Sequence, residues 1–297
     1  MKSRLARGGF DLIYCNAVTN WRMLSMFESV GLPVITHCHE LESLIQLTGI
    51  DNFNRLRDRT SHFVAVSDAV RRNLIAHDVS GDKISLIHAF TPIEEMSSEE
   101  IVSRQKSIRD ELGLPPYAFI VGASGSLNWR KAPELFVQIA AKVNHDQIYF
   151  VWIGGANKGD FRLFELNYDA GRLGVGERVR FLEHKRNPMD YFAAIDVFAM
   201  VSREDPYPLV CLEAASLGKP IICFADAGGM PEFVEDDCGF VVPYLDIDAF
   251  AERVIEMYEN PKMARAFGQN ASQKVRGRHD IEVVAPMVRK LIQRYLS

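Results

Sequence analysis

The chain has 297 residues, 47% of them hydrophobic and 25% charged, and a formal net charge of −5 at pH 7. This composition is typical of globular proteins with one large or two ordinary domains, and the acidic balance gives no electrostatic footprint for nucleic acid. No apolar stretch approaches the ~20 residues that a membrane-spanning helix needs.

The first ten residues, MKSRLARGGF, carry basic side chains but lack the apolar core of a signal peptide. Five cysteines are scattered along the chain without a CxxC pair, which favours reduced thiols over a disulfide framework. Both features predict a cytoplasmic protein, with at most peripheral contact at the inner face of the membrane.

Short runs rich in β-branched and aromatic residues alternate with amphipathic helical patterns along the whole chain. Apolar runs of four to six residues between helices are typical of parallel strands that are covered on both faces. The fold class we predict is therefore α/β, with doubly wound parallel sheets. The expected strands are residues 11–15, 34–37, 63–66, 84–87, 119–122, 148–153, 179–181, 197–200, 221–224 and 240–242.

A change of pattern near residue 92 divides the chain. The polar run 93–100 ends the first set of strands, and its serines can cap a helix that ends near Leu112. The first domain contains four expected strands, fewer than a complete doubly wound unit, so we expect it to be incomplete. The predicted division is a partial N-terminal domain over residues 1–92, a linker and helix over 93–116, and a C-terminal domain over 117–279.

The segment THCHELE runs from the end of the second expected strand into a helix and places His37, Cys38, His39 and Glu40 together. Their spacing is loose for a metal site and no second cluster accompanies them, so we predict no metal. We favour a histidine at the cleft that hydrogen-bonds a substrate. The alternative is a histidine whose hydrogen bonds are satisfied at the strand end.

The segment GASGSLNWRKAPELF contains a glycine turn and then a helix that Pro133 opens, with Arg130 and Lys131 just ahead of its start. Cations are disfavoured at a helix N-terminus unless an anion joins them. Backbone N–H groups and both side chains can converge on a diphosphate, which is the ligand we predict; a solvated basic pair is the alternative. The turn matches neither a GxxxxGK(S/T) phosphate loop nor a GxGxxG fingerprint, which argues against a dehydrogenase.

The segment SREDPYPLVCLEAASLGKP contains a lone carboxylate, Glu213, within an apolar helical run. The preceding strand ends near Val201, at the sheet edge where open α/β folds bind ligands, and Pro208 suits the first helical position. The free N–H groups of Leu209 and Val210 can then face a phosphate or sugar oxygen. Since an unpaired buried carboxylate costs several kcal/mol, Glu213 needs a partner, and paired ribose hydroxyls suit it; exposure or a lysine partner is the alternative.

A third signal is AGGMPEFV, in which Gly228 and Gly229 precede a short helix opened by Pro231. Glycine lets the main chain approach a ligand closely, so we predict that this pair borders the same edge of the sheet. A lone glycine pair is also common in ordinary turns.

These segments, together with VWIGG and VRFLEH and in this order, resemble a retaining glycosyltransferase of family 4 with the GT-B fold. The resemblance covers nearly the whole chain and is strongest over residues 119–242. It implies two Rossmann-type domains that face a cleft, with a nucleotide-activated sugar in the C-terminal domain and a hydroxyl acceptor in the N-terminal one. It also implies catalysis without a metal or other cofactor, and a final helix over residues 280–297 that returns toward the N-terminal domain.

The resemblance extends to the acidic residues. Glu213 matches the second of two family glutamates spaced eight apart, and this second glutamate holds the ribose. Asp205 is in register with the first and is our choice for the acid that meets the donor sugar, while Glu204 is one residue out of register.

The resemblance also covers the basic residues. Arg130 and Lys131 match the family's pair on the diphosphate, although Ala132 replaces the glycine that commonly follows. His39 matches the strand-end histidine beside the reacting sugar, with His37 as the second choice. The predicted catalytic residues are His39 and Asp205, and the predicted donor-binding residues are Arg130, Lys131, Glu213, Leu209, Val210, Gly125, Glu204, Gly228 and Gly229.

The activity implied is transfer of a hexose from a nucleotide-diphosphate sugar to a hydroxyl with retention of configuration, in glycan or polysaccharide biosynthesis. The family's acceptor domain has further βα units ahead of the strand at 11–15, so roughly half of a unit of ~six strands is expected to be absent. Two alternatives are a nucleotide-sugar-binding module without transfer activity and a sugar-nucleotide epimerase of the same fold. The acceptor is left open between a lipid-linked saccharide, a growing polysaccharide and a small molecule.

Overall fold

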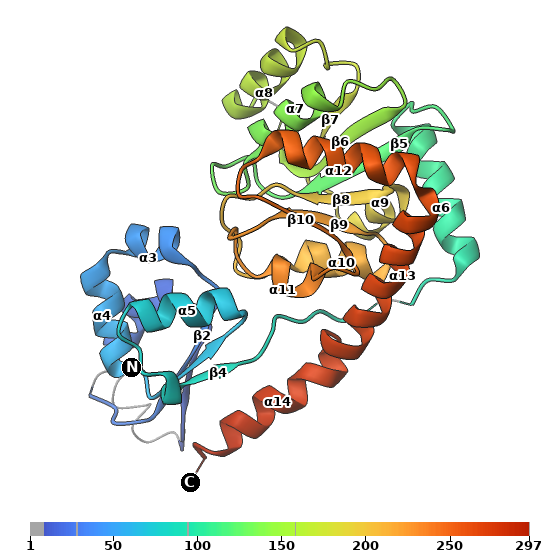
Figure 1. The fold of residues 1–297 in the computed structure, drawn as a ribbon. Coiled ribbons are helices and arrows are strands. Elements are labelled where there is room, and N and C mark those ends of the chain that lie inside the picture. The colour runs from blue at the N-terminus through green and yellow to red at the C-terminus, as the bar shows by residue number, and fades with distance from the viewer. Residues whose placement is uncertain (1–8, 28, 94, 158, 297) are drawn as a thin grey trace.

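The computed structural model describes residues 9–27, 29–93, 95–157 and 159–296. They form two parallel β-sheets, each packed with helices, in two lobes (Figure 1). The strands within these residues are β1 (Ile13–Cys15), β2 (Val34–Cys38), β3 (His62–Ala65), β4 (Ile84–Leu86), β5 (Phe119–Ser124), β6 (Ile148–Ala156), β7 (Val179–Glu183), β8 (Val197–Met200), β9 (Ile221–Phe224) and β10 (Gly239–Val242). Every predicted strand is confirmed, with ends that differ by at most three residues.

The helices lie between the strands and after them. Those of the N-terminal lobe are the short η1 (Val18–Asn20) and η2 (Gly81–Lys83), α2 (Trp21–Ser25), α3 (Glu42–Thr48), α4 (Ile50–Arg59) and α5 (Asp68–Ala76). The later helices are α6 (Ser98–Glu111), α7 (Pro133–Val143), α8 (Phe161–Arg172), α9 (Pro188–Ala194), α10 (Leu209–Ser216), α11 (Met230–Val234), α12 (Ile247–Glu259), α13 (Pro261–Arg278) and α14 (Ile281–Gln293). No helix of the described residues is both long and apolar enough to cross a bilayer.

The helix starts follow local sequence signals. Ser97 caps α6 through a capping box with Glu100, as its position in the polar run predicts. Pro133 opens α7, also as predicted. For α10 the prediction was one residue early, because Pro208 has extended backbone angles and forms the N-cap, so that the helix begins at Leu209.

The N-terminal sheet has the strand order β1-β2-β3-β4, with all neighbours parallel. Because successive strands are neighbours, right-handed crossovers put the connecting helices on one face. Val34 of β2 therefore shares a core with Phe53 of α4. Ile35, which points the other way, packs with Val284 and Leu291 of α14. The described strands thus wind in one direction, and α14 covers the face that the connecting helices leave open.

The C-terminal sheet has the order β10-β9-β8-β5-β6-β7 and is doubly wound. The chain builds outward from β5 to β7 and then returns to the other side of β5 for β8 to β10. The winding reverses between β5 and β8, and open α/β sheets bind ligands outside the carboxyl ends of strands at such a point. We therefore expect a ligand-binding site at the loops after β5 and β8.

The chain crosses between the lobes twice, and the two crossings are bonded to each other. The N–H of Thr91 donates to the carbonyl of His279 at 3.0 Å, and the N–H of Ile281 donates to the carbonyl of Thr91 at 3.2 Å. Asp280 caps the start of α14 with its side chain. The last helix then runs from the C-terminal lobe toward the N-terminal one (Figure 1).

Candidate active site

The loops after β5 and β8 form the centre of the candidate site. The N–H of Arg203 donates to the carbonyl of Arg130 at 2.8 Å and joins the two loops. Lys131 and Asp205 line a small cavity of about 10 Å³ together with Pro208 and Val210 from the start of α10. The predicted basic pair, the predicted acid and the predicted helix start are therefore brought together at the switch point of the sheet.

Asp205 is the counter-ion of the basic pair. Its carboxylate lies 2.5 Å from Nζ of Lys131 and 3.5 Å from a guanidinium nitrogen of Arg130, and the Ser202 hydroxyl donates to it at 3.3 Å. Asp205 is only 5% exposed. Two cations and one carboxylate leave this cluster with one net positive charge, so it can still attract an anion. The predicted contact between Asp205 and a donor sugar stays a prediction.

The backbone around Lys131 explains two of the small residues nearby. A Cβ on Gly125 would lie 3.1 Å from the Lys131 side chain, and Gly125 has φ of 147°, which suits glycine. Ala132, the N-cap of α7, is left-handed with φ of 55°. A left-handed alanine costs roughly 1–2 kcal/mol, which accounts for the glycine that the family commonly has here.

Glu204 points away from this cluster, toward the N-terminal lobe. Its carboxylate accepts from the N–H of Ser43 at 3.0 Å and from the Ser43 hydroxyl at 2.5 Å. Ser43 is in the first turn of α3, so Glu204 satisfies a helix N-terminus of the other lobe. Its backbone carbonyl accepts a 3.0 Å bond from Arg130 of the basic pair. The structure therefore gives Glu204 an interlobe contact, and its predicted contact to a donor stays a prediction.

Glu213 lies in the second turn of α10 and is half-buried. Leu209 at the start of the helix is 45% exposed at the cleft, and Val210 is half-buried. The first N–H groups of a helix have no acceptor within it, so those of Leu209 and Val210 remain candidates for an anionic ligand. The ribose contact of Glu213 stays a prediction.

Gly228 and Gly229 allow a close approach of two backbone segments. A Cβ on Gly228 would lie 1.8 Å from the carbonyl oxygen of Asp205, and one on Gly229 would lie 2.4 Å from that of Pro206. The N–H of Asp205 also donates to the carbonyl of Ala227 at 2.7 Å. The glycine pair thus holds the loop that carries Asp205. The close approach is to this loop, while the contact to a ligand that we predicted stays a prediction.

His37, near the end of β2, and His39, just after it, lie on the N-terminal side of the cleft. Their rings are 4.2 Å apart; Tyr14 Oη is 2.8 Å from Nδ1 of His37, and Asn16 Oδ1 is 3.0 Å from Nε2 of His39. Burial lowers the pKa of His37 to about 3 and also lowers the pKa of His39, so both rings are neutral at pH 7. Nε2 of His37 is buried and has no hydrogen-bond partner within the described residues. Among all the residues that the structure describes, no group of three or more His, Cys, Asp and Glu side chains is arranged to hold a metal ion.

A pocket of about 480 Å³ lies beside these histidines and extends to the start of α10. His37 and His39 line it from the N-terminal lobe, Leu209 from the C-terminal lobe, and Val288 and Ile292 from α14. A ligand in this pocket therefore touches both lobes and the returning helix.

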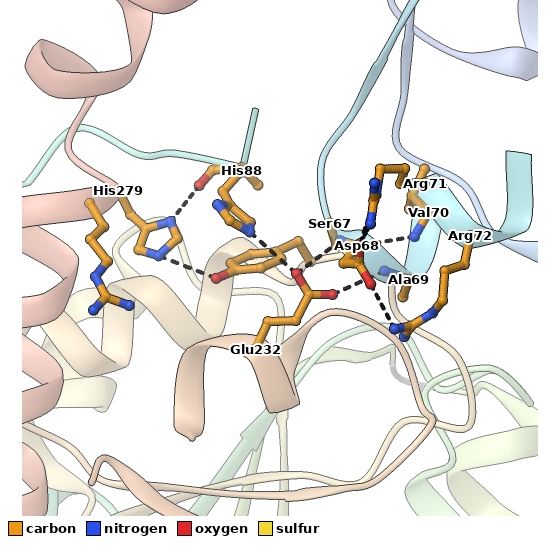
Figure 2. A network of polar contacts seen from close by, with 12 residues as sticks. Ser67, Asp68, Ala69, Val70, Arg71, Arg72, His88, Glu232 and His279 are labelled. Atoms are coloured by element: carbon orange, nitrogen blue, oxygen red, sulfur yellow. Dashed lines mark hydrogen bonds and ion pairs between the residues drawn. The ribbon is translucent and has the colours of Figure 1, made fainter. Parts of the chain in front are cut away.

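Sequence reasoning missed a second contact between the lobes, which Figure 2 shows. The carboxylate of Glu232, from α11, accepts from the N–H groups of Asp68 at 2.9 Å and Ala69 at 3.0 Å, at the start of α5. His88 also reaches it, with Nε2 at 3.3 Å. Glu232 follows the glycine pair closely in AGGMPEFV, but nothing local indicates a partner more than 160 residues away.

Comparisons with known proteins agree with this geometry. The family model described as "Glycosyl transferases group 1" matches residues 104–274, more than half of the chain, and the model described as "Glycosyltransferase Family 4" matches residues 1–95. Among curated relatives, the D-inositol 3-phosphate glycosyltransferase of Mycolicibacterium gilvum is 27% identical over 70% of this chain and 45% of its own length. The D-inositol 3-phosphate glycosyltransferase 2 of Catenulispora acidiphila is 27% identical over 82% of this chain and 61% of its own length. The chain thus spans about half the length of the curated relatives it matches.

Solved structures show the same fold. HepE from Anabaena, in complex with UDP and glucose, matches 98% of this chain and 80% of its own chain, with a TM-score of 0.87 at 22% identity. Sucrose-phosphate synthase from Thermosynechococcus elongatus matches 99% and 75%, with a TM-score of 0.81 at 20% identity. The two parallel sheets and the basic pair at the switch point agree with the family-model matches. The chain therefore belongs to the glycosyl transferases of group 1, with the GT-B fold.

Proposed function

We propose that this protein transfers a sugar from a nucleotide-diphosphate sugar to a hydroxyl acceptor with retention of configuration. The observation that carries the proposal is the cluster of Arg130, Lys131 and Asp205 beside the start of α10, with one net positive charge. A diphosphate there would meet both cations and the free N–H groups of the helix. HepE is a relative in fold whose structures contain UDP and UDP-glucose, so UDP-glucose is the first donor to test.

The proposed reaction breaks the bond between the anomeric carbon and the diphosphate oxygen. The acceptor hydroxyl forms the new glycosidic bond on the same face, and its proton passes to the departing phosphate. Negative charge grows on the diphosphate as the bond breaks, and Arg130 and Lys131 stabilise it. Electrostatic stabilisation of this kind often lowers an enzymatic barrier more than any other single effect.

The remaining residues bind and orient in this proposal. Glu213 holds the ribose hydroxyls from the second turn of α10, and His39, neutral at pH 7, hydrogen-bonds the transferred sugar from the opposite side of the cleft. Asp205 sets the position of the two cations. Gly125 leaves room for the Lys131 side chain to reach it.

The test removes the two cations. An Arg130→Ala/Lys131→Ala variant should lower the turnover of UDP-glucose at least ~100-fold, because the departing diphosphate loses its charge partners. Lys142→Ala is the matched control, since Lys142 pairs with Asp248 on the protein surface at 2.7 Å. Turnover is read as UDP release, and the configuration of the product by NMR.

Unchanged turnover in the double variant would refute the role of the basic pair, and an inverted product would refute retention. Binding of UDP-glucose without transfer to any acceptor would identify a binding module instead.

A further inference from the structure

We infer that the pocket beside His39 takes an uncharged acceptor in which an apolar ring or chain adjoins the reacting hydroxyl, and that it does not take a phosphorylated polyol. This inference rests on the proposed function, because it concerns the acceptor of the same transfer. An uncharged acceptor would distinguish this chain from the relatives named D-inositol 3-phosphate glycosyltransferase, a name that contains a phosphorylated polyol.

The first observation is the charge of the pocket. None of the described residues that line it is Lys, Arg, Asp or Glu. Its titratable groups are two histidines and two tyrosines. Burial lowers the pKa of both histidines, raises the pKa of Tyr14 to about 12 and raises that of Tyr207 well above its ordinary value. All four are therefore neutral at pH 7, and the lining carries no charge.

The second observation is the chemistry of the walls. Apolar surface comes from Val288 and Ile292 of α14, from Leu209 of α10, and from Phe90 in the segment after β4. The strand ends supply hydrogen-bonding groups, including the side chain of Asn16. A molecule with a hydroxyl on one side and an apolar portion on the other matches these walls, since the apolar portion gains free energy by leaving water.

A phosphate would be badly placed in this pocket. An ion that leaves water without a counter-charge loses several kcal/mol. The cations of the proposed donor site, Arg130 and Lys131, are absent from the lining and pair with Asp205. They are also the groups assigned to the donor diphosphate, so an acceptor phosphate would have to compete with it for them.

The experiment measures acceptor binding directly, by calorimetry on the full chain saturated with UDP. The probes are phenyl β-D-glucoside and D-inositol 3-phosphate. We expect the glucoside to bind and the phosphate to bind at least ~100-fold more weakly, as a charge desolvation of a few kcal/mol gives.

Two variants of α14 locate the binding. Ile292→Lys places a charge in the lining and should weaken phenyl glucoside binding at least ~10-fold, because the apolar portion then meets an ammonium group. Met287→Lys is the matched control: Met287 is on the same helix, is 49% exposed and does not line the pocket, so the affinity should be unchanged. An unaltered UDP affinity verifies that each variant is folded. Val288→Thr, which keeps the volume and adds a hydroxyl, serves if the lysine variant does not fold.

Each outcome is decisive. Comparable or tighter binding of the phosphate, binding of neither probe, or a glucoside affinity that Ile292→Lys and Val288→Thr leave unchanged would overturn the inference while the donor assignment stands. Failure of the parent chain to bind UDP would overturn the proposed function and this inference with it.

Discussion

At the scale of single residues, the candidate site is organised by a buried carboxylate. Asp205 meets Lys131 at 2.5 Å, and their side chains are 6% and 14% exposed. A pair so poorly hydrated holds the lysine in place, and Arg130 shares the same acid at 3.5 Å. In the proposed function, the acid therefore acts on the donor through the two cations.

The first prediction concerns this acid. Asp205→Asn should lower the free energy of unfolding by about 3 kcal/mol, because it leaves Lys131 buried without its counter-ion. Asp248→Asn breaks an ion pair in which the Asp248 side chain is 67% exposed and the Lys142 side chain is 49% exposed. Its loss should lower the free energy of unfolding by less than about 1 kcal/mol. Urea unfolding of both variants measures the two losses. Equal small losses would mean that the buried pair does not hold Lys131.

At the scale of elements, the loop after β8 depends on the glycine pair that follows β9. The loop and the glycines form an isolated bridge between Asp205 and Gly228, outside either sheet ladder. Gly228 has φ of 131° and leaves no room for a Cβ against the Asp205 carbonyl. The position of the acid is therefore fixed by backbone contacts as well as by its ion pairs.

The second prediction tests this support. Gly228→Ala should lower the free energy of unfolding by at least about 2 kcal/mol, since it adds both backbone strain and a steric clash. Gly174→Ala also places an alanine at a positive φ, here 75°, but has nothing within 4 Å of the added carbon, so we expect a loss of about 1 kcal/mol. Thermal unfolding compares the two. A smaller loss of stability for Gly228→Ala than for Gly174→Ala would show that the loop after β8 moves to accept the added carbon without strain.

The elements also show how far the sequence could be interpreted. The strands follow from local apolar runs, and Arg130 and Lys131 could be assigned together because one loop holds both. The partner of Lys131 could not be found this way, because Asp205 is 74 residues away and is brought close only by the return of the chain to β8. The hydrogen bond between Glu204 and Ser43 joins residues 161 positions apart in two lobes. The charge pattern around Glu204 therefore does not indicate this partner.

At the scale of the whole molecule, two carboxylates of the C-terminal lobe hold helix starts of the N-terminal lobe. Glu204 meets Ser43 at the start of α3, and Glu232 meets Asp68 and Ala69 at the start of α5 (Figure 2). A helix N-terminus attracts negative charge, so each contact adds to the attraction between the lobes. These contacts join the two lobes that border the cleft.

The third prediction loosens one of these contacts. Glu232→Ala should speed hydrogen exchange at the N–H groups of Asp68 and Ala69 roughly fivefold to tenfold, because the acceptor of both bonds is lost. Glu235→Ala is the control, since Glu235 pairs with Arg278 at 2.9 Å and Lys274 at 3.2 Å on α13 of its own lobe. Exchange measured by mass spectrometry should differ between the variants only at α5. Unchanged protection there would mean that Glu232 does not join the lobes.

The placement of α14 has a consequence for synthesis on the ribosome. Ile35 and Val64 of the first sheet find their covering partners in Val284 and Leu291, more than 200 positions later in translation. The sheet of the N-terminal lobe is therefore made before the helix that covers one of its faces, and this apolar face stays exposed while the C-terminal lobe is being synthesised. During synthesis this face is open to aggregation until α14 has left the exit tunnel.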